Sequence, residues 1–192
     1  MTQQVMTEKM PVITNGVNVT ALYETLEAVK ATPLIADFRF RASNKWMGGD
    51  RNHTTITGFR GACAEQTHQM GPFEMDNAEP PVLLGGGEAP NPVEWVLHAL
   101  AGCLTTTMVY HAAARGIEIE EVSSELEGDL DLRGFLGLSN KVRKGYHTVR
   151  VRMKVRSDAD PETLKALAQY SPVYDIVSNS LPVEVTVETM SR

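Results

Sequence analysis

The spacing of apolar residues changes several times along the chain. Residues 19–29 carry apolar side chains at helical spacing, which predicts a short amphipathic helix that ends before a proline. Residues 34–41 alternate between apolar and polar, which predicts a strand with one solvent-exposed face. After a Gly-rich turn at residues 47–50, the β-branched run 54–57 and a segment near residues 73–75 predict further strands.

The longest apolar stretch spans residues 92–115 and predicts a long central helix. It follows a loop rich in Pro and Gly, and Asn91, Pro92 and Glu94 stand in the order of a capping box at its start. Gly116, just past the last turn, marks its end. Because nearly every side of this helix is apolar or small, we expect it to be buried all round.

Two alternating segments of opposite charge follow the central helix. Acidic and apolar residues alternate over 121–132, and basic and apolar residues alternate over 149–156. Antiparallel pairing of these segments would place opposite charges across from each other, so we expect a hairpin, connected through residues 134–145. We interpret its charges as a solvated face.

The remaining pattern predicts two short helices and a closing strand. One helix begins at Asp160-Pro161, a second follows a break at Ser171-Pro172, and a strand over 182–187 would turn its valines inward. The order of elements predicts one α+β domain with antiparallel sheets over residues 33–192. It is preceded by an N-terminal extension, residues 1–32, which contains the first helix.

Composition narrows the classes of partner. The chain has 192 residues, 42% of them hydrophobic, and a net charge of −6, which argues against binding to nucleic acid. The N-terminus lacks the pattern of a secretory leader, and no window is apolar enough to span a membrane. We therefore expect a cytoplasmic protein without a membrane partner, in which the two cysteines are thiols.

Few side chains stand out as candidates for chemistry. Cys103 lies halfway along the central helix, too far from its start for the helix dipole to activate the thiol, so the periodicity alone favours inert packing over catalysis. The five histidines lack the spacing of a structural zinc site, and the Gly85–Gly87 run lacks a phosphate-binding pattern. We expect neither a metal nor another cofactor.

The start of the central helix resembles the OsmC/Ohr family of thiol-dependent hydroperoxide reductases. The matching residues are Asn91-Pro92, Glu94, Ala99 and Ala101-Gly102-Cys103. Ser171-Pro172-Val173 stands where family members carry Cys-Pro-Val or a similar triplet. The resemblance implies an OsmC-like fold, with antiparallel sheets wrapped around the long central helix in an intertwined homodimer.

The resemblance also implies a reaction. In the family the central-helix cysteine, here Cys103, attacks an organic hydroperoxide as a thiolate and becomes a sulfenic acid, and a second cysteine then forms a disulfide with it. Such a peroxiredoxin-like peroxidase serves defence against oxidative stress. The substrate would be an organic hydroperoxide whose alkyl group enters an apolar pocket at the dimer interface.

Two departures from the family pattern affect this expectation. Val93 replaces the glutamate that follows Asn-Pro in Ohr-type members. Glu94, one place later, is a catalytic candidate beside Cys103, but it points away from the thiol and its capping role is a sufficient explanation. Arg51 is the candidate for the family arginine. Ser171 replaces the resolving cysteine, so either an external thiol reduces Cys103 or Cys63 takes the resolving role. The alternative is a non-catalytic relative that binds a small apolar or thiol-reactive ligand at the dimer interface.

Overall fold

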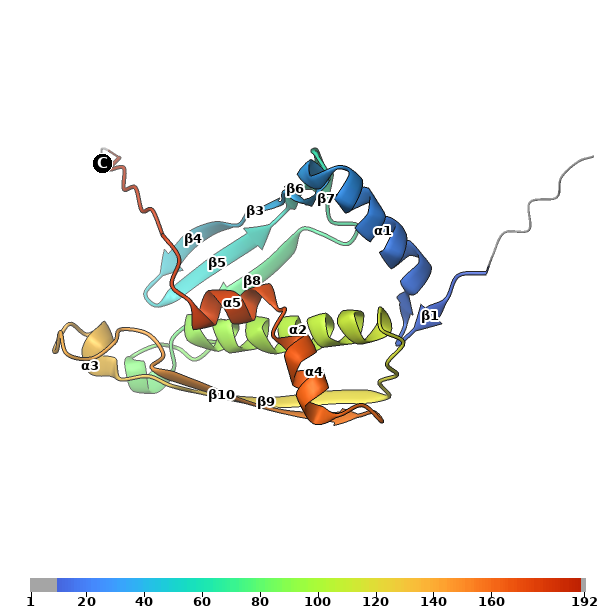
Figure 1. Ribbon diagram of the computed structural model, residues 1–192. Helices are drawn as coiled ribbons and strands as arrows, with labels where there is room; N and C mark the ends of the chain where they lie inside the picture. Colours follow the sequence, from blue (N-terminus) through green and yellow to red (C-terminus); the bar gives the residue numbers. More distant parts are fainter. Residues whose placement is uncertain (1–9, 191–192) are drawn as a thin grey trace, which may run out of the picture.

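The computed structural model describes residues 10–190 and confirms an α+β architecture with antiparallel sheets (Figure 1). The α-helices are α1 (Val19–Ala31), α2 (Pro92–Ala113), α3 (Leu132–Phe135), α4 (Pro161–Ala168) and α5 (Pro172–Ser178). The strands are β1 (Ile13–Thr14), β2 (Val17–Asn18), β3 (Arg39–Phe40), β4 (Ser43–Gly48), β5 (Arg51–Ile56), β6 (Gly58–Gly61), β7 (Ala64–Thr67), β8 (Phe73–Asn77), β9 (Glu121–Asp129) and β10 (Thr148–Arg156). Two 3-10 helices, η1 (Pro33–Ala36) and η2 (Pro81–Leu83), complete the described elements.

The main hydrophobic core forms where α2 packs against the β9–β10 hairpin and against α4. Its buried members lie one helical turn apart on α2 or on the inner side of α4. They are Leu100, Leu104, Met108, Ala112, Leu164, Leu167 and Ala168. Partly buried apolar residues of β9, β10 and α5 surround them. The predicted inward faces of the hairpin and of α4 are thus confirmed.

The β9–β10 hairpin pairs in the register that its charges predict. Arg150 lies opposite Glu127, Arg152 opposite Glu125 and Arg156 opposite Glu121. Arg150 also forms two short hydrogen bonds with the Asp129 carboxylate, at 2.6 and 2.8 Å. All of these side chains are on the solvent side, as expected.

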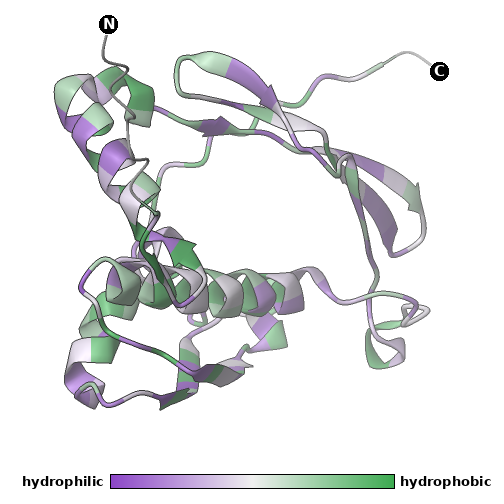
Figure 2. Cartoon of the chain, turned by 90° about the vertical axis from the view of Figure 1, so that its right-hand side faces the viewer, coloured by the Kyte–Doolittle hydropathy of each residue, from purple (hydrophilic) through white to green (hydrophobic). Residues whose placement is uncertain are grey.

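Six strands form two small sheets on the other side of the chain, in the orders β3-β6-β7 and β4-β5-β8. Figure 2 shows that α1 stands between these sheets and the end of α2. Its base is fixed by two long-range contacts. The Asn15 side chain bonds the Ile117 carbonyl and the Ile119 amide, both at 2.9 Å, and the Tyr23 hydroxyl donates to the Ala114 carbonyl at 2.6 Å.

The strand predicted over residues 34–41 is largely wrong. Pro33 begins a 3-10 helix, closed by bonds from the Ile35 amide to the Thr32 carbonyl and from the Asp37 amide to the Leu34 carbonyl. A proline fixes φ in the helical range and readily opens such a turn, which overrides the alternation that follows it. Strand pairing is confined to Arg39 and Phe40.

The closing strand predicted over residues 182–187 is also absent. This segment leaves α5 on the side away from β10 and pairs with no strand of residues 10–190 (Figure 1). Val183, Val185 and Val187 are 77–81% exposed rather than turned inward. An alternating segment can form a strand only beside a free edge, and this chain brings none to it.

The central helix is confirmed, but its burial is not complete within one chain. Leu100, Leu104 and Met108 are buried, whereas Val96 and Tyr110 are 39% and 49% exposed. The exposed stripe on α2 consists of Val96, Ala99, Gly102, Thr106 and Tyr110. No helix among residues 10–190 has the length and apolar content needed to cross a bilayer.

Candidate functional site

Cys103 lies in the middle of α2, at the border between the buried and the exposed side of the helix. Its thiol is free and half-buried, between exposed Gly102 and buried Leu104. The space beside Gly102 is open, since an added Cβ there would have no atom within 4 Å apart from its own helix. Within one chain, the Gly102 side of α2 is therefore uncovered.

Arg51, the candidate thiolate partner, begins β5 and forms an ion pair with Glu88, with Nη1 3.2 Å from Oε2. The preceding residue, Asp50, accepts hydrogen bonds from the amides of Glu79 and Gly86 at 2.8 and 3.2 Å. These backbone bonds, foremost that of Glu79, lower the pKa of the Asp50 carboxyl. Asp50 and Arg51 together hold the loop that leads into α2.

Glu94 has the capping role that the sequence predicts. The Asn91 amide donates to the Glu94 carboxylate at 2.8 Å, and the Asn91 side chain accepts from the Val93 amide at 2.9 Å. The Asn91 side chain also accepts from the Glu94 amide, so both halves of the capping box are present. The Asn91 side-chain amide also donates to the Glu79 carboxylate, so the motif fastens the loop as well as the helix.

Ser171, at the resolving-cysteine position of the family, is the N-cap of α5. Its side chain is buried, with 1% exposure, and its Oγ accepts from the Tyr174 amide at 3.1 Å. The hydroxyl therefore satisfies a helix end, which is a structural role that sequence reasoning did not assign to it.

Cys63 lies in the turn between β6 and β7, far along the chain from Cys103. Ala62 and Cys63 both have left-handed backbone, with φ of 49° and 62°, and the Cys63 thiol donates to the Leu34 carbonyl at 3.6 Å. The two cysteines are free and belong to different parts of the fold.

His111 is a titratable residue near the end of α2. Its ring stacks on Tyr170, with centroids 4.5 Å apart, and its Nδ1 lies 3.1 Å from the Arg115 guanidinium. Burial lowers the pKa of His111, and the Arg115 charge lowers it further. The neutral ring can accept the bond from Arg115 at Nδ1.

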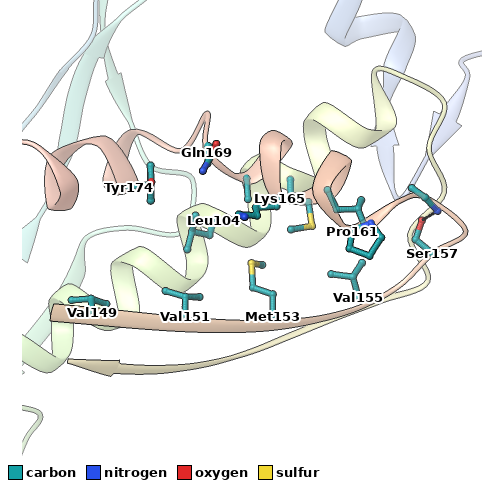
Figure 3. A pocket seen from close by; sticks show the side chains of 14 residues that line it. Leu104, Val149, Val151, Met153, Val155, Ser157, Pro161, Lys165, Gln169 and Tyr174 are labelled. Carbon is teal, nitrogen blue, oxygen red and sulfur yellow. Dashed lines mark hydrogen bonds between the residues drawn. The ribbon is translucent and has the colours of Figure 1, made fainter. Parts of the chain in front are cut away.

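An apolar cavity of about 610 Å³ lies on the buried side of α2, between β10 and α4 (Figure 3). Leu104 and Met108 line it from α2, and Val151 and Met153 line it from β10. Its polar groups come from Ser157, Lys165, Gln169 and Tyr174. The cavity was missed from the sequence because alternation shows which side chains point inward, but not how far apart the layers lie.

Among the described residues, no cluster of three or more His, Cys, Asp or Glu side chains is arranged to hold a metal ion. The acidic side chains around the start of α2, which are Asp50, Glu79, Glu88 and Glu94, are engaged by backbone amides, Asn91 or Arg51.

The sequence model of one protein family covers most of this site. The model described as OsmC-like protein matches residues 85–188, which is more than half of the chain and includes α2 through α5. The chain belongs to the OsmC family. No functionally curated protein matches it in sequence.

Solved structures show the same OsmC fold at low sequence identity. A protein ascribed to the osmotic-stress and detoxification response of Psychrobacter arcticus 273-4 is 18% identical, with a TM-score of 0.51 over 69% of this chain and 83% of its own. An OsmC-like protein from Mycoplasma pneumoniae is 13% identical, with a TM-score of 0.55 over 74% and 89%. An OsmC-like protein of unknown function from Vibrio cholerae is 14% identical, with a TM-score of 0.53 over 76% and 95%.

Proposed function

We propose that this OsmC-family chain is a thiol peroxidase that reduces organic hydroperoxides through Cys103. The Cys103 thiolate attacks one oxygen of the O–O bond, so that an S–O bond forms, the other oxygen leaves as an alcohol after taking a proton, and the sulfur becomes a sulfenic acid. Two equivalents of an external thiol then reduce the sulfenic acid, with release of water and a disulfide of the external thiol.

The observation that carries this proposal is the position of the Cys103 thiol. It is half-buried on the central helix of an OsmC-family domain, at the border of the exposed stripe of α2. The stress-response role ascribed to the Psychrobacter protein of the same fold agrees with it. Because Ser171 cannot form a disulfide, the proposed cycle uses one cysteine and requires a reducing compartment, for which we propose the cytoplasm.

Arg51 is the cation that we assign to the thiolate, and this role requires its ion pair with Glu88 to open. The pair is exposed on both sides, at 55% and 61%, so little energy holds it closed. Glu88→Gln should then raise the reactivity of the Cys103 thiolate, whereas Arg51→Met should lower it.

We further propose that the active form is a homodimer. The exposed stripe on α2 needs an apolar cover. The strands from β3 to β8 contribute no residue to the two hydrophobic clusters of the described chain, yet they carry exposed Phe40 and Trp46, at 73% and 71%. A second copy would complete the core by covering these surfaces together with the alternating segment 182–187.

The test is peroxide consumption by the purified protein. With cumene hydroperoxide and dithiothreitol, the wild type should turn over, Cys103→Ser should lose all turnover, and Cys63→Ser should keep it. Mass spectrometry after dimedone treatment should place the adduct on Cys103. Absence of turnover, or turnover that survives Cys103→Ser, would rule out the proposed reaction.

The apolar cavity favours a second candidate function, the binding of a small apolar ligand. Cys103 does not line this cavity, although its neighbour Leu104 does. A Cys103 pKa near the unperturbed value of about 8.5, measured from the pH dependence of alkylation, would favour binding over catalysis.

A further inference from the structure

The connection between β9 and β10 projects from the far end of the hairpin (Figure 1). It carries exposed apolar side chains. We call residues 131–144, which include α3, the basic tip. Phe135, Leu136 and Leu138 are 66%, 57% and 72% exposed. Three large apolar side chains within four positions form a patch that a surface normally avoids unless something covers it.

The fold holds this patch in place. The Leu136 amide bonds the Leu132 carbonyl at 2.8 Å, and the Leu138 amide bonds the Arg133 carbonyl at 2.9 Å. Gly134 is buried against the Arg143 carbonyl, where an added Cβ would come within 2.5 Å. The apolar side chains are therefore presented by an ordered loop rather than by a disordered one.

The base of the tip is tied to the start of the central helix. Just beyond the tip, the Tyr146 hydroxyl donates to the Val93 carbonyl at 2.9 Å, and its ring packs so closely on Gly128 that an added Cβ would come within 2.5 Å. The tip thus has a fixed place relative to α2, and it cannot fold back onto the core without breaking these contacts.

The tip is also strongly basic, although the whole chain has a net charge of −6. It contains Arg133, Lys141, Arg143 and Lys144 against a single carboxylate, Asp131, which gives it a net charge of +3. Asp131 pairs with Arg133, with Nη2 2.5 Å from Oδ2. In the described part of the chain, no carboxylate lies within ion-pair distance of the other three cations, which are exposed.

Exposed apolar side chains next to unpaired cations match the surface of an anionic lipid bilayer. The cations bind headgroup phosphates and the apolar side chains enter the boundary with the acyl chains. A protein partner would need a groove to receive the patch, whereas a projecting tip can enter a lipid surface directly.

We propose that the basic tip docks on anionic membranes, with Phe135, Leu136 and Leu138 inserted and with Lys141, Arg143 and Lys144 on the headgroups. This attachment is peripheral, and it revises the expectation of no membrane partner, which was based on the absence of a spanning segment. The proposal is independent of the peroxidase reaction, because its tests measure binding alone.

The charge requirement is tested by co-sedimentation of the full chain with vesicles. The wild type should bind vesicles of phosphatidylcholine mixed with phosphatidylglycerol and should not bind phosphatidylcholine alone. Each cation strengthens such binding by about fivefold, so K141Q/R143Q/K144Q should weaken it by about 100-fold. The control K30Q/K45Q/R60Q, which removes the same charge from other exposed positions, should bind much more like the wild type.

Insertion is tested separately from charge. F135S/L136S/L138S should lose binding while its circular dichroism stays native, because these side chains contact solvent rather than the core. A tryptophan at position 135 (Phe135→Trp) should shift its emission to the blue and be quenched by brominated lipid.

Three results would overturn the proposal. The first is the absence of wild-type binding to anionic vesicles, and the second is equal binding by the tip and control variants. The third is a change in oligomeric state of F135S/L136S/L138S by sedimentation velocity, which would show that the patch meets a second copy instead.

Discussion

The hydroxyl of Ser171 holds the start of helix α5, because it accepts a hydrogen bond from the Tyr174 amide at 3.1 Å. Ser171 is 1% exposed. The position at which the family carries a resolving thiol is used here to cap a helix. A thiol is a weaker hydrogen-bond acceptor than a hydroxyl, so the helix cap favours serine at this position, whereas the two-cysteine cycle requires cysteine.

Ser171→Ala should therefore destabilise the protein by about 1 kcal/mol, since it removes a helix cap. Ser171→Thr, which keeps the hydroxyl, should lose less than the alanine variant. The measurement is urea unfolding, and Ser178→Ala at the exposed end of the same helix is the matched control, with a change of about 0.5 kcal/mol or less. Equal losses at both positions would show that the cap contributes nothing.

Asn15 should be a second point of sensitivity, because its side chain joins the N-terminal hairpin to the segment after α2. It donates to the Ile117 carbonyl and accepts from the Ile119 amide, both at 2.9 Å, from a left-handed backbone with φ of 53°. Asn15→Ala loses both bonds and also strains the backbone, so it should cost about 2–3 kcal/mol.

Two further variants separate these causes. Asn15→Gly loses the bonds but accepts the left-handed backbone, so it should be less harmful than alanine. Asn15→Asp keeps the acceptor for the Ile119 amide and loses only the donor. If all three variants melt at the wild-type temperature, the hairpin is not anchored by Asn15.

The features that were well predicted from the sequence depend on residues close to one another along the chain or on a simple alternation of charge. The capping box of Asn91 and Glu94 involves residues three positions apart, so its chemistry is fully contained in the motif. The β9–β10 register was predictable because opposite charges alternate on both segments. At Ser171 the motif identified the family position, while the capping role depends on a helix that begins at the next residue.

Features that depend on distant elements were not predictable. Val183 and its neighbours have the pattern of a strand, but a strand exists only where another part of the molecule offers an edge. The cavity between β10 and α4 depends on the spacing of layers, and the exposure of Phe135 depends on how its loop closes. The ion pair between Arg51 and Glu88 likewise results from the loop that Asp50 holds.

His111 should make stability depend on pH just below neutrality. Burial and the Arg115 charge lower its folded-state pKa below the ordinary value of 6.5. Below that value the unfolded chain binds more protons than the folded one, so stability is full above about pH 6.5 and falls as the pH drops through this range. Thermal melts should show a smaller loss between pH 7 and pH 5.5 for His111→Gln than for the wild type.

Arg115→Met provides the control for this effect, since it removes one of the two causes of the shift and leaves the other. Its melting temperature should fall less steeply with pH than that of the wild type and more steeply than that of His111→Gln. Asp131 titrates in a different range, because Arg133 lowers the pKa of its carboxyl to about 2. Parallel pH curves for all three proteins would show that His111 is not the titrating group.

Gly102→Leu on α2 should affect the stability of the single chain and the association of the dimer in different ways. Within one chain the added side chain meets open space, and leucine is the better helix former by nearly 1 kcal/mol, so the folded chain should be as stable or more stable. In the proposed dimer, the same side chain would enter a close contact on the exposed stripe of α2 and cost about 1–3 kcal/mol, which weakens association about 5- to 150-fold.

Sedimentation velocity over a range of concentrations measures this association. Ala28→Leu, at an exposed position of α1, adds a side chain of the same kind to another helix and should leave the dimer intact. If Gly102→Leu stays dimeric at every concentration at which the wild type does, the two central helices do not meet at this stripe. The alternative cover of α2 is then the partner's sheets β3–β8, which carry exposed Phe40, Trp46 and Phe73.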